Sequence, residues 1–193
     1  VMRSDFEVAT TLYAKWTVNT YTVTLNQQSA TTDGTKSVNV NYGSAMPSIT
    51  LPKRTGYTFG GFYTSTSGSG TKYYNANGSS ARTYTLTSAT TLYAYWTKDT
   101  YTITYNNNGG TINTTPTTSY QYGNSVTLPD DVTRDGCTFG GWFDNANCEG
   151  GAVTTIPSSS TGNKTFYAKW TPNTYAVRLH PGEGTIQSGN VTS

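Results

Sequence analysis

Cysteine and histidine are the side chains best suited to nucleophilic or metal chemistry, and this sequence holds two cysteines and one histidine. Cys137 and Cys148 are close in the chain, and their spacing in a threonine-rich sequence predicts a local disulfide in an oxidising compartment. Closing so short a loop would contribute about 3 kcal/mol. Two free thiols are the alternative. His180 stands beside Pro181, and because a catalytic triad needs a base next to its nucleophile, we expect His180 to be a surface turn residue.

Oxygen ligands gather in one loop, formed by Asp144, Asn145, Asn147 and Glu149. Calcium accepts such ligands, but their spacing is not that of a calcium-binding loop, so the sequence favours a polar turn. Paired carboxylates for glycosidic cleavage would need a cleft between them, which small thin domains rarely provide. These patterns together predict that the chain is not an enzyme and carries no metal site and no cofactor.

The composition favours an all-β protein with thin cores. Apolar residues make up 34% and charged residues 11% of the chain, while 16 tyrosines and 4 tryptophans suit half-buried pleated surfaces. The formal net charge is +2 and no basic stripe occurs, so nucleic acid is not an expected partner. No apolar run approaches the length of a transmembrane helix, so we expect no direct membrane insertion.

A six-residue motif that ends in Trp-Thr occurs three times, at residues 12–17, 92–97 and 166–171. Other marks keep the same order between these occurrences, among them Tyr-Gly, Leu-Pro and a glycine-rich aromatic segment. The successive tryptophans are 80 and 74 positions apart, and the difference falls in one variable region. A repeat of this kind predicts stacked or strung copies of one domain.

The repeat divides the chain into four parts. Residues 21–96 and 101–170 are the two complete copies, joined and followed by short linkers at 97–100 and 171–174. Residues 1–16 are expected to be the C-terminal strand of a preceding copy, and residues 175–193 the N-terminal strand of a following one. Short linkers favour beads arranged as a semi-rigid rod.

Each copy is predicted to be mostly β, α+β at most. Tyr21, Val23 and Leu25 alternate with threonines, which indicates a half-exposed strand, and Val38 to Tyr42 continue the alternation as the second strand of a hairpin. Two adjacent glycines inside the later aromatic strand predict a bulge. Any helix is expected to be short, around residues 76–81. A hairpin first and a separate pair of strands later suit a small β-grasp-like domain, and a small β-sandwich is the alternative.

Aromatic residues are assigned two roles. The predicted core anchors are Trp16, Phe59, Trp96, Phe139, Trp142 and Trp170. Tyr93, Tyr95 and Tyr167, together with Tyr13, alternate away from the tryptophan face, and Tyr73, Tyr74 and Tyr84 lie in the variable region. These tyrosines are interpreted as exposed, where they either contact a ligand or cover the second face of a thin sheet.

The marks of each copy resemble the Listeria–Bacteroides repeat, also called the internalin B-repeat. In the first copy they lie at residues 21–23, 42–43, 52, 56–62 and 92–96. The second copy matches equally, except that Cys137 replaces the usual Tyr, and in the first copy Phe62 stands where Trp is usual. The resemblance implies a β-grasp-like module of stalks and adhesins in bacterial surface or secreted proteins, and it brings no catalytic residue.

The expected function is therefore structural. The repeats are predicted to be spacers of an extracellular, cell-surface or secreted bacterial protein that present other domains, with neighbouring repeats as their partners. The alternative is an adhesive module in which Tyr93, Tyr95 and Tyr167 bind a host glycan or protein, with multiplicity raising avidity.

Overall fold

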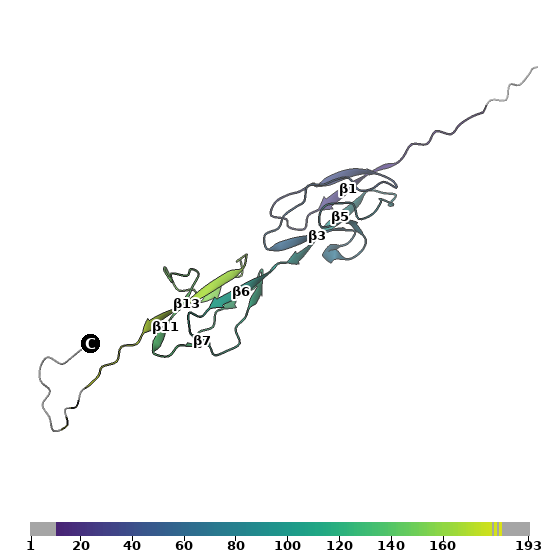
Figure 1. The fold of residues 1–193 in the computed structure, drawn as a ribbon. Helices are drawn as coiled ribbons and strands as arrows, with labels where there is room; N and C mark the ends of the chain where they lie inside the picture. Colours follow the sequence, from purple (N-terminus) through teal and green to yellow (C-terminus); the bar gives the residue numbers. More distant parts are fainter. Residues whose placement is uncertain (1–10, 179, 181, 183–193) are drawn as a thin grey trace, which may run out of the picture. The chain divides into compact units, whose positions relative to one another are not determined.

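The computed structural model describes residues 11–178, 180 and 182. The chain forms two compact units, which divide between Asp99 and Thr100, and strands dominate both (Figure 1). The prediction of a mostly-β protein is confirmed, since the helical structure of the described residues is one 3-10 turn, η1 (Thr66–Gly68). Residues 76–81 hold no helix; a tight turn replaces it, in which the Gly78 N–H donates to the Asn75 carbonyl at 2.9 Å.

Unit 1, which ends at Asp99, carries a five-stranded sheet in the order β2-β1-β5-β3-β4. Its strands are β1 (Thr20–Asn26), β2 (Ser37–Asn41), β3 (Tyr57–Tyr63), β4 (Lys72–Tyr74) and β5 (Thr90–Lys98). β1 pairs antiparallel with β2 and parallel with β5, while β3 pairs antiparallel with both β4 and β5. The two hairpins, β1 with β2 and β3 with β4, thus flank β5, which runs parallel to β1, and this is the β-grasp-like arrangement that the sequence predicts.

Unit 2, which begins at Thr100, repeats this plan with four strands in its main sheet, ordered β11-β13-β6-β8. Its strands are β6 (Thr100–Asn106), β7 (Thr111–Ile112), β8 (Ser119–Gln121), β9 (Val126–Thr127), β10 (Val132–Thr133), β11 (Cys137–Phe143), β12 (Thr155–Ile156) and β13 (Lys164–Pro172). The counterpart of β4 is reduced to one bridge between Trp142 and Val153. Two short ribbons, β7 with β10 and β9 with β12, lie outside the main sheet.

The predicted glycine bulge occurs in both units. The register of β3 against β5 shifts between Phe59 and Gly61, and that of β11 against β13 shifts between Phe139 and Trp142. Gly61 has φ +122°, and a Cβ there would lie 2.2 Å from the Tyr74 carbonyl oxygen. Only glycine lets the β4 backbone approach β3 this closely.

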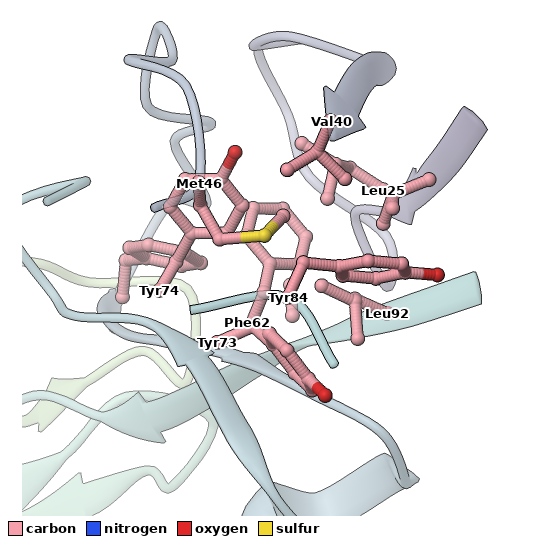
Figure 2. Close-up of a cluster of buried hydrophobic side chains, with 11 residues drawn as sticks. Leu25, Val40, Met46, Phe62, Tyr73, Tyr74, Tyr84 and Leu92 are labelled. Carbon is pink, nitrogen blue, oxygen red and sulfur yellow. The ribbon is translucent and has the colours of Figure 1, made fainter. Parts of the chain in front are cut away.

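The core of unit 1 is built from both hairpins and from the variable region (Figure 2). Tyr73, Tyr74 and Tyr84 are 1%, 0% and 0% exposed, so their interpretation as exposed residues is wrong. The reason is backbone pairing that the sequence does not reveal. β4 joins the sheet edge, and Tyr84 exchanges hydrogen bonds with the Gly43 N–H and the Ser44 carbonyl at 2.7 and 2.8 Å.

The buried tyrosines make stability sensitive to alkaline pH. Burial raises the pKa of Tyr74 to about 12, and it also raises the pKa values of Tyr105 and Tyr120. An unfolded tyrosine ionises near pH 10, so between about pH 10 and 12 the unfolded chain has released protons that the folded chain keeps. The free energy of unfolding is therefore expected to fall as pH rises through this range, which thermal melts in a pH series would measure.

The Tyr74→Phe variant is the control for this prediction. It keeps the ring, and it removes the titrating hydroxyl that donates to the Pro47 carbonyl at 2.9 Å. Its unit 1 should lose less stability between pH 10 and 12 than the parent does. An identical loss in both proteins would show that Tyr74 does not govern the alkaline transition.

Five of the six residues predicted as core anchors lie in or against the two cores. Phe59 and Trp142 are 8% and 2% exposed, while Trp96, Phe139 and Trp170 are half-buried and pack against the two cores. Phe59 and Phe139 lie with their ring centroids 5.4 and 5.3 Å from those of Trp96 and Trp170.

Trp16 is the exception, because its side chain is 89% exposed. In unit 1 the corresponding Trp96 packs between β3 and the loop after β1, and residues 11–19 have neither partner and form no strand. The predicted terminal strand at 1–16 is thus contradicted over residues 11–16, and residues 1–10 lie outside the described residues. At the other end, residues 173–178 form no strand either, and most of 179–193 also falls outside the described residues.

Candidate functional site

The side chains best suited to metal binding lie apart in the part of the chain that the structure describes. Within residues 11–178, 180 and 182, no three side chains of histidine, cysteine, aspartate or glutamate gather where they could hold a metal ion. His180 is exposed. No helix among these residues has the length and apolar character needed to cross a membrane.

Cys137 and Cys148 are free thiols, which contradicts the predicted disulfide. Cys137 begins β11 opposite Pro172, whereas the Cys148 thiol lies 3.9 Å from the Ala168 carbonyl. These two positions on β13 are four residues apart, or about 13 Å along a strand. Disulfide geometry allows a Cα separation of at most about 7 Å, so β13 holds the two thiols too far apart.

The oxygen-rich loop is a hydrogen-bonded turn, as the sequence favours. The Asn145 side chain joins its two ends, because its amide nitrogen donates to the Glu149 carbonyl at 2.9 Å and its oxygen accepts from the Glu149 N–H at 3.1 Å. The same amide nitrogen donates to Asp144 Oδ1 at 3.2 Å. The Asn145 side chain is thus committed to closing the turn.

The tyrosines on the second sheet face are half-buried, and one has a clear packing role. Tyr95 contacts Tyr63 edge-on, with centroids 5.9 Å apart, and a Cβ added at Gly60 or Gly68 would lie 2.6 or 2.8 Å from its ring. In unit 2 the same position is Lys169, whose Nζ donates to the Cys148 carbonyl at 3.1 Å. This position covers the sheet beneath a turn in both units. A ligand contact by Tyr93, Tyr95 or Tyr167 stays a prediction.

A groove of about 450 Å³ opens in unit 1 between the loop after β1 and the segment before β3. Three aromatic side chains line it, those of Tyr57, Phe59 and Trp96. Lys53 and Arg54 line it as well, and the guanidinium carbon of Arg54 lies 3.9 Å from the centroid of the Tyr57 ring. A smaller hollow of about 210 Å³ shares Arg54 and Trp96 with this groove.

The tryptophan of the last strand pins the loop after the first strand in both units. The Trp96 indole N–H donates to the Gln27 carbonyl at 3.0 Å, and the Trp170 indole N–H donates to the Asn107 carbonyl at 2.8 Å. These are long-range contacts between the ends of a copy. They explain why the Trp must sit at the end of each repeated motif.

An arginine holds the next residue of the same loop. Arg54 Nη1 donates to the Gln28 carbonyl at 3.3 Å, and Arg134 Nη1 donates to the Asn108 carbonyl at 3.0 Å. The arginine clamp was not predicted from the sequence. Its signal is that Arg54 and Arg134 each precede an equivalent glycine, Gly56 or Gly136, by two residues.

The family model of the Listeria–Bacteroides repeat domain matches residues 21–95 and 101–169, which is most of the chain. The chain belongs to this family. Unit 1 and unit 2 each contain one Listeria–Bacteroides repeat, and the indole and arginine clamps are shared by both copies. No solved structure matches the chain.

Three relatives contain similar repeats. Internalin H of Listeria monocytogenes is 34% identical over 71% of this chain and 23% of its own length. Two proteins of Evansella cellulosilytica, described as a putative membrane protein and a putative Gly-rich membrane protein, are 31% and 28% identical over 90% of this chain and 24% and 19% of their own lengths. The chain therefore spans at most about a quarter of these relatives, and its repeats are those of bacterial surface proteins of the internalin kind.

The two Listeria–Bacteroides repeats fill one core position from different segments of the chain, a loop in unit 1 and strand β8 in unit 2. In unit 1 the Tyr84 hydroxyl donates to the Ser88 carbonyl at 2.6 Å. In unit 2 the Tyr120 hydroxyl donates to the Gly162 carbonyl at 2.6 Å. Ser88 and Gly162 both precede the last strand by two residues, so the hydrogen bond is conserved between copies while the tyrosine that makes it is not.

Proposed function

We propose that these repeats are spacers of a bacterial cell-surface or secreted protein and that they present other domains of that protein. Neighbouring repeats of the same chain are their partners, and residues 1–16 and 175–193 belong to flanking copies. The proposal requires no enzyme activity and no cofactor. The observation that carries it is the way each linker residue is bound to its own repeat.

Asp99 is the single residue between β5, which ends at Lys98, and β6, which begins at Thr100. Its N–H donates to the Gly56 carbonyl at 3.0 Å, and its Oδ1 accepts from the Thr58 hydroxyl at 2.6 Å. Both contacts lie within unit 1, so the linker is held by the repeat that precedes it. A linker with one residue, itself bonded, has few freely rotating backbone bonds.

The same clamp recurs after unit 2. The Asn173 N–H donates to the Gly136 carbonyl at 2.8 Å, and Asn173 Oδ1 accepts from the Thr138 hydroxyl at 2.6 Å. Aspartate and asparagine share only the side-chain oxygen that the threonine needs. The same pair of contacts thus holds the linker residue after each repeat, although the residue differs. Such contacts would restrict bending at each joint, as a semi-rigid spacer requires.

A stiff joint should be visible in solution. We expect ¹⁵N relaxation of the full chain to give the same rotational diffusion tensor for both units, as for a single anisotropic body. Inserting Gly-Ser-Gly-Ser after Asp99 should decouple their tumbling, and Thr58→Val should shift the tensors toward independence. Thr138→Val, which alters the clamp after unit 2, is the matched control. Independent tumbling of the two units in the parent chain would contradict the spacer proposal.

A further inference from the structure

We propose that the groove of unit 1 is a binding site for an anionic saccharide, such as a sugar ring that carries a carboxylate. The inference is separate from the spacer function, because it concerns the surface of one repeat and not the joints of the array. It rests on the side chains that line the groove, on their charges, and on the differences between the two copies.

The groove offers aromatic surface for a sugar ring. Trp96 and Tyr57 are half-buried at the groove, and Phe59 lies behind them with 8% of its surface exposed. The CH faces of pyranoses pack on such rings, because both surfaces are apolar and flat while the sugar hydroxyls point outward. A volume of about 450 Å³ lies in the range of small-ligand sites.

Hydroxyl groups line the same groove as the aromatic side chains. Thr31, Thr32 and Thr55 line the groove and are exposed. Backbone pairing fixes their positions, since the N–H groups of Thr31 and Thr32 both donate to the Lys53 carbonyl, at 2.7 and 3.1 Å. The Thr31 hydroxyl is bonded within the loop, since it donates to the Lys53 carbonyl at 3.2 Å and accepts from the Thr55 N–H and hydroxyl at 3.2 and 3.4 Å. The Thr32 hydroxyl can donate to or accept from the ring hydroxyls of a saccharide, and the Thr55 hydroxyl can accept from them.

The charge of the lining selects an anion. Lys53 and Arg54 give it a formal charge of +2, and no aspartate or glutamate lines it. In the part of the chain that the structure describes, no carboxylate lies within ion-pair distance of either cation. Arg54 is oriented by Tyr57 and by its bond to the Gln28 carbonyl, and a guanidinium held in this way is suited to a carboxylate.

Unit 2 keeps the clamps of the repeat but not these groove side chains. At the positions of Lys53, Thr55 and Tyr57 it has Thr133, Asp135 and Cys137, while Arg134 matches Arg54. The fold therefore does not need the lysine, the hydroxyl or the tyrosine at these places. Their presence together in unit 1 is what a ligand would require, and the residues of unit 2 supply variants that the fold accepts.

The test is titration of the full chain with trigalacturonate, followed by ¹H–¹⁵N chemical-shift changes at low salt. Binding should perturb the groove loops at residues 31–32 and 53–57 and leave unit 2 unchanged. Maltotriose, which is neutral, and inorganic sulfate, which lacks the ring, should bind at least about tenfold more weakly if ring and charge act together.

Two exposed substitutions taken from unit 2, K53T and T55D, lower the formal charge of the lining from +2 to 0. We expect this double variant to bind trigalacturonate about tenfold more weakly, since two ionic contacts of partly exposed groups change. K164T removes a lysine from unit 2, where unit 1 has Thr90, and should leave the affinity unchanged. Thermal melts would verify that all variants stay folded.

Three outcomes would overturn the proposal. The first is no shift in the groove loops at millimolar trigalacturonate. The second is equal binding of sulfate, which would mean attraction to charge alone. The third is equal weakening by K164T and by the K53T/T55D double variant, which would mean that the net charge of the chain and not the groove governs binding. None of these outcomes bears on the tumbling of the two units, so the spacer function is tested independently.

Discussion

Replacing Trp96 with alanine is expected to destabilise unit 1 by about 3–5 kcal/mol, enough to unfold it well below the melting temperature of unit 2. The indole packs against the Phe59 ring, which in turn packs against Phe62, and the indole N–H satisfies the Gln27 carbonyl at 3.0 Å. The truncation removes both, and it leaves the parallel pairing of β1 with β5 without its end contact. Trp170→Ala should do the same to unit 2, where the indole N–H satisfies the Asn107 carbonyl.

Differential scanning calorimetry of the full chain measures this, because each variant keeps one unaltered unit as an internal reference. The matched control is Trp16→Ala, which truncates the same side chain in a repeat of the same motif. Trp16 is 89% exposed, so this change should leave both transitions in place. A Trp96→Ala melt that coincides with that of Trp16→Ala would show that the indole does not hold unit 1 together.

Strand periodicity predicted the sheet because the first and last strands of each copy carry their signal locally. β1 alternates threonine with buried residues such as Val23 and Leu25, and β5 alternates Leu92 and Ala94 with half-buried tyrosines. A period of two and one apolar face suffice to assign such strands. A hairpin first and a separate pair of strands later favoured a β-grasp-like domain, while the order of the strands in the sheet comes from the structure.

The same period-two pattern did not predict the burial of the tyrosines in the variable region. Tyr73 and Tyr74 are adjacent and both buried, which no alternating pattern would indicate, and Tyr84 lies in no strand. The burial of Tyr84 depends on backbone bonds to Gly43 and Ser44, about 40 positions away, and the burial of Tyr73 and Tyr74 depends on the pairing of β4 with β3. A tyrosine that can serve at a surface or in a core gives no local signal of which it does.

The cysteine prediction took proximity in sequence as proximity in the fold, and the end-strand prediction took the repeated motif as sufficient for a strand. Cys137 and Cys148 are close in the chain, but Cys137 lies at the start of β11, opposite Pro172, and the turn after β11 places Cys148 beside Ala168 of β13. Trp16 carries the motif of Trp96, but the motif is a strand only where the other strands of its copy surround it. The groove of unit 1 likewise needs Thr31, Lys53 and Trp96 brought together by the fold.

Tyr84 in unit 1 and Tyr120 in unit 2 fill the same site in the core from different positions in the repeat. The core therefore requires a tyrosine ring and its hydrogen bond at this site, whichever position in the chain supplies them. In unit 1 the ring comes from Tyr84, 5.9 Å from the ring of Tyr21 by centroids, and Val40 lies in β2 opposite Tyr21. In unit 2 the ring comes from Tyr120 in β8, opposite Tyr101 and 5.3 Å from its ring.

In each unit, the position that corresponds to the tyrosine of the other unit holds a smaller residue. Ser158 accepts the backbone bond from Gly123 that Tyr84 accepts from Gly43, so Ser158 and Tyr84 are equivalent. Val40 and Tyr120 are equivalent through the register of their hairpins. Each unit thus pairs one tyrosine with one small residue, which keeps the summed volume of the two side chains similar.

This exchange predicts a strong coupling between positions 40 and 84. Tyr84→Ser alone should cost unit 1 about 3–5 kcal/mol, because it empties a fully buried ring site. Val40→Tyr alone should cost about 1–3 kcal/mol by overpacking a core that already holds Tyr84. The double variant recreates the arrangement of unit 2, with a hydroxyl able to reach the Ser88 carbonyl, so its loss should be well below the sum of the single losses.

Denaturant unfolding of the four proteins in this cycle gives the coupling free energy, with unit 2 as the reference transition. The reciprocal pair, Tyr120→Val with Ser158→Tyr, should show the same sign of coupling in unit 2. Additive losses in both units would mean that the two tyrosines occupy different spaces. Coupling in both would show that repeats of this family can diverge in sequence by moving a core ring between a loop and a strand while the sheet stays unchanged. Packing would then require that the volume is filled and the carbonyl is hydrogen-bonded, whichever segment supplies the side chain.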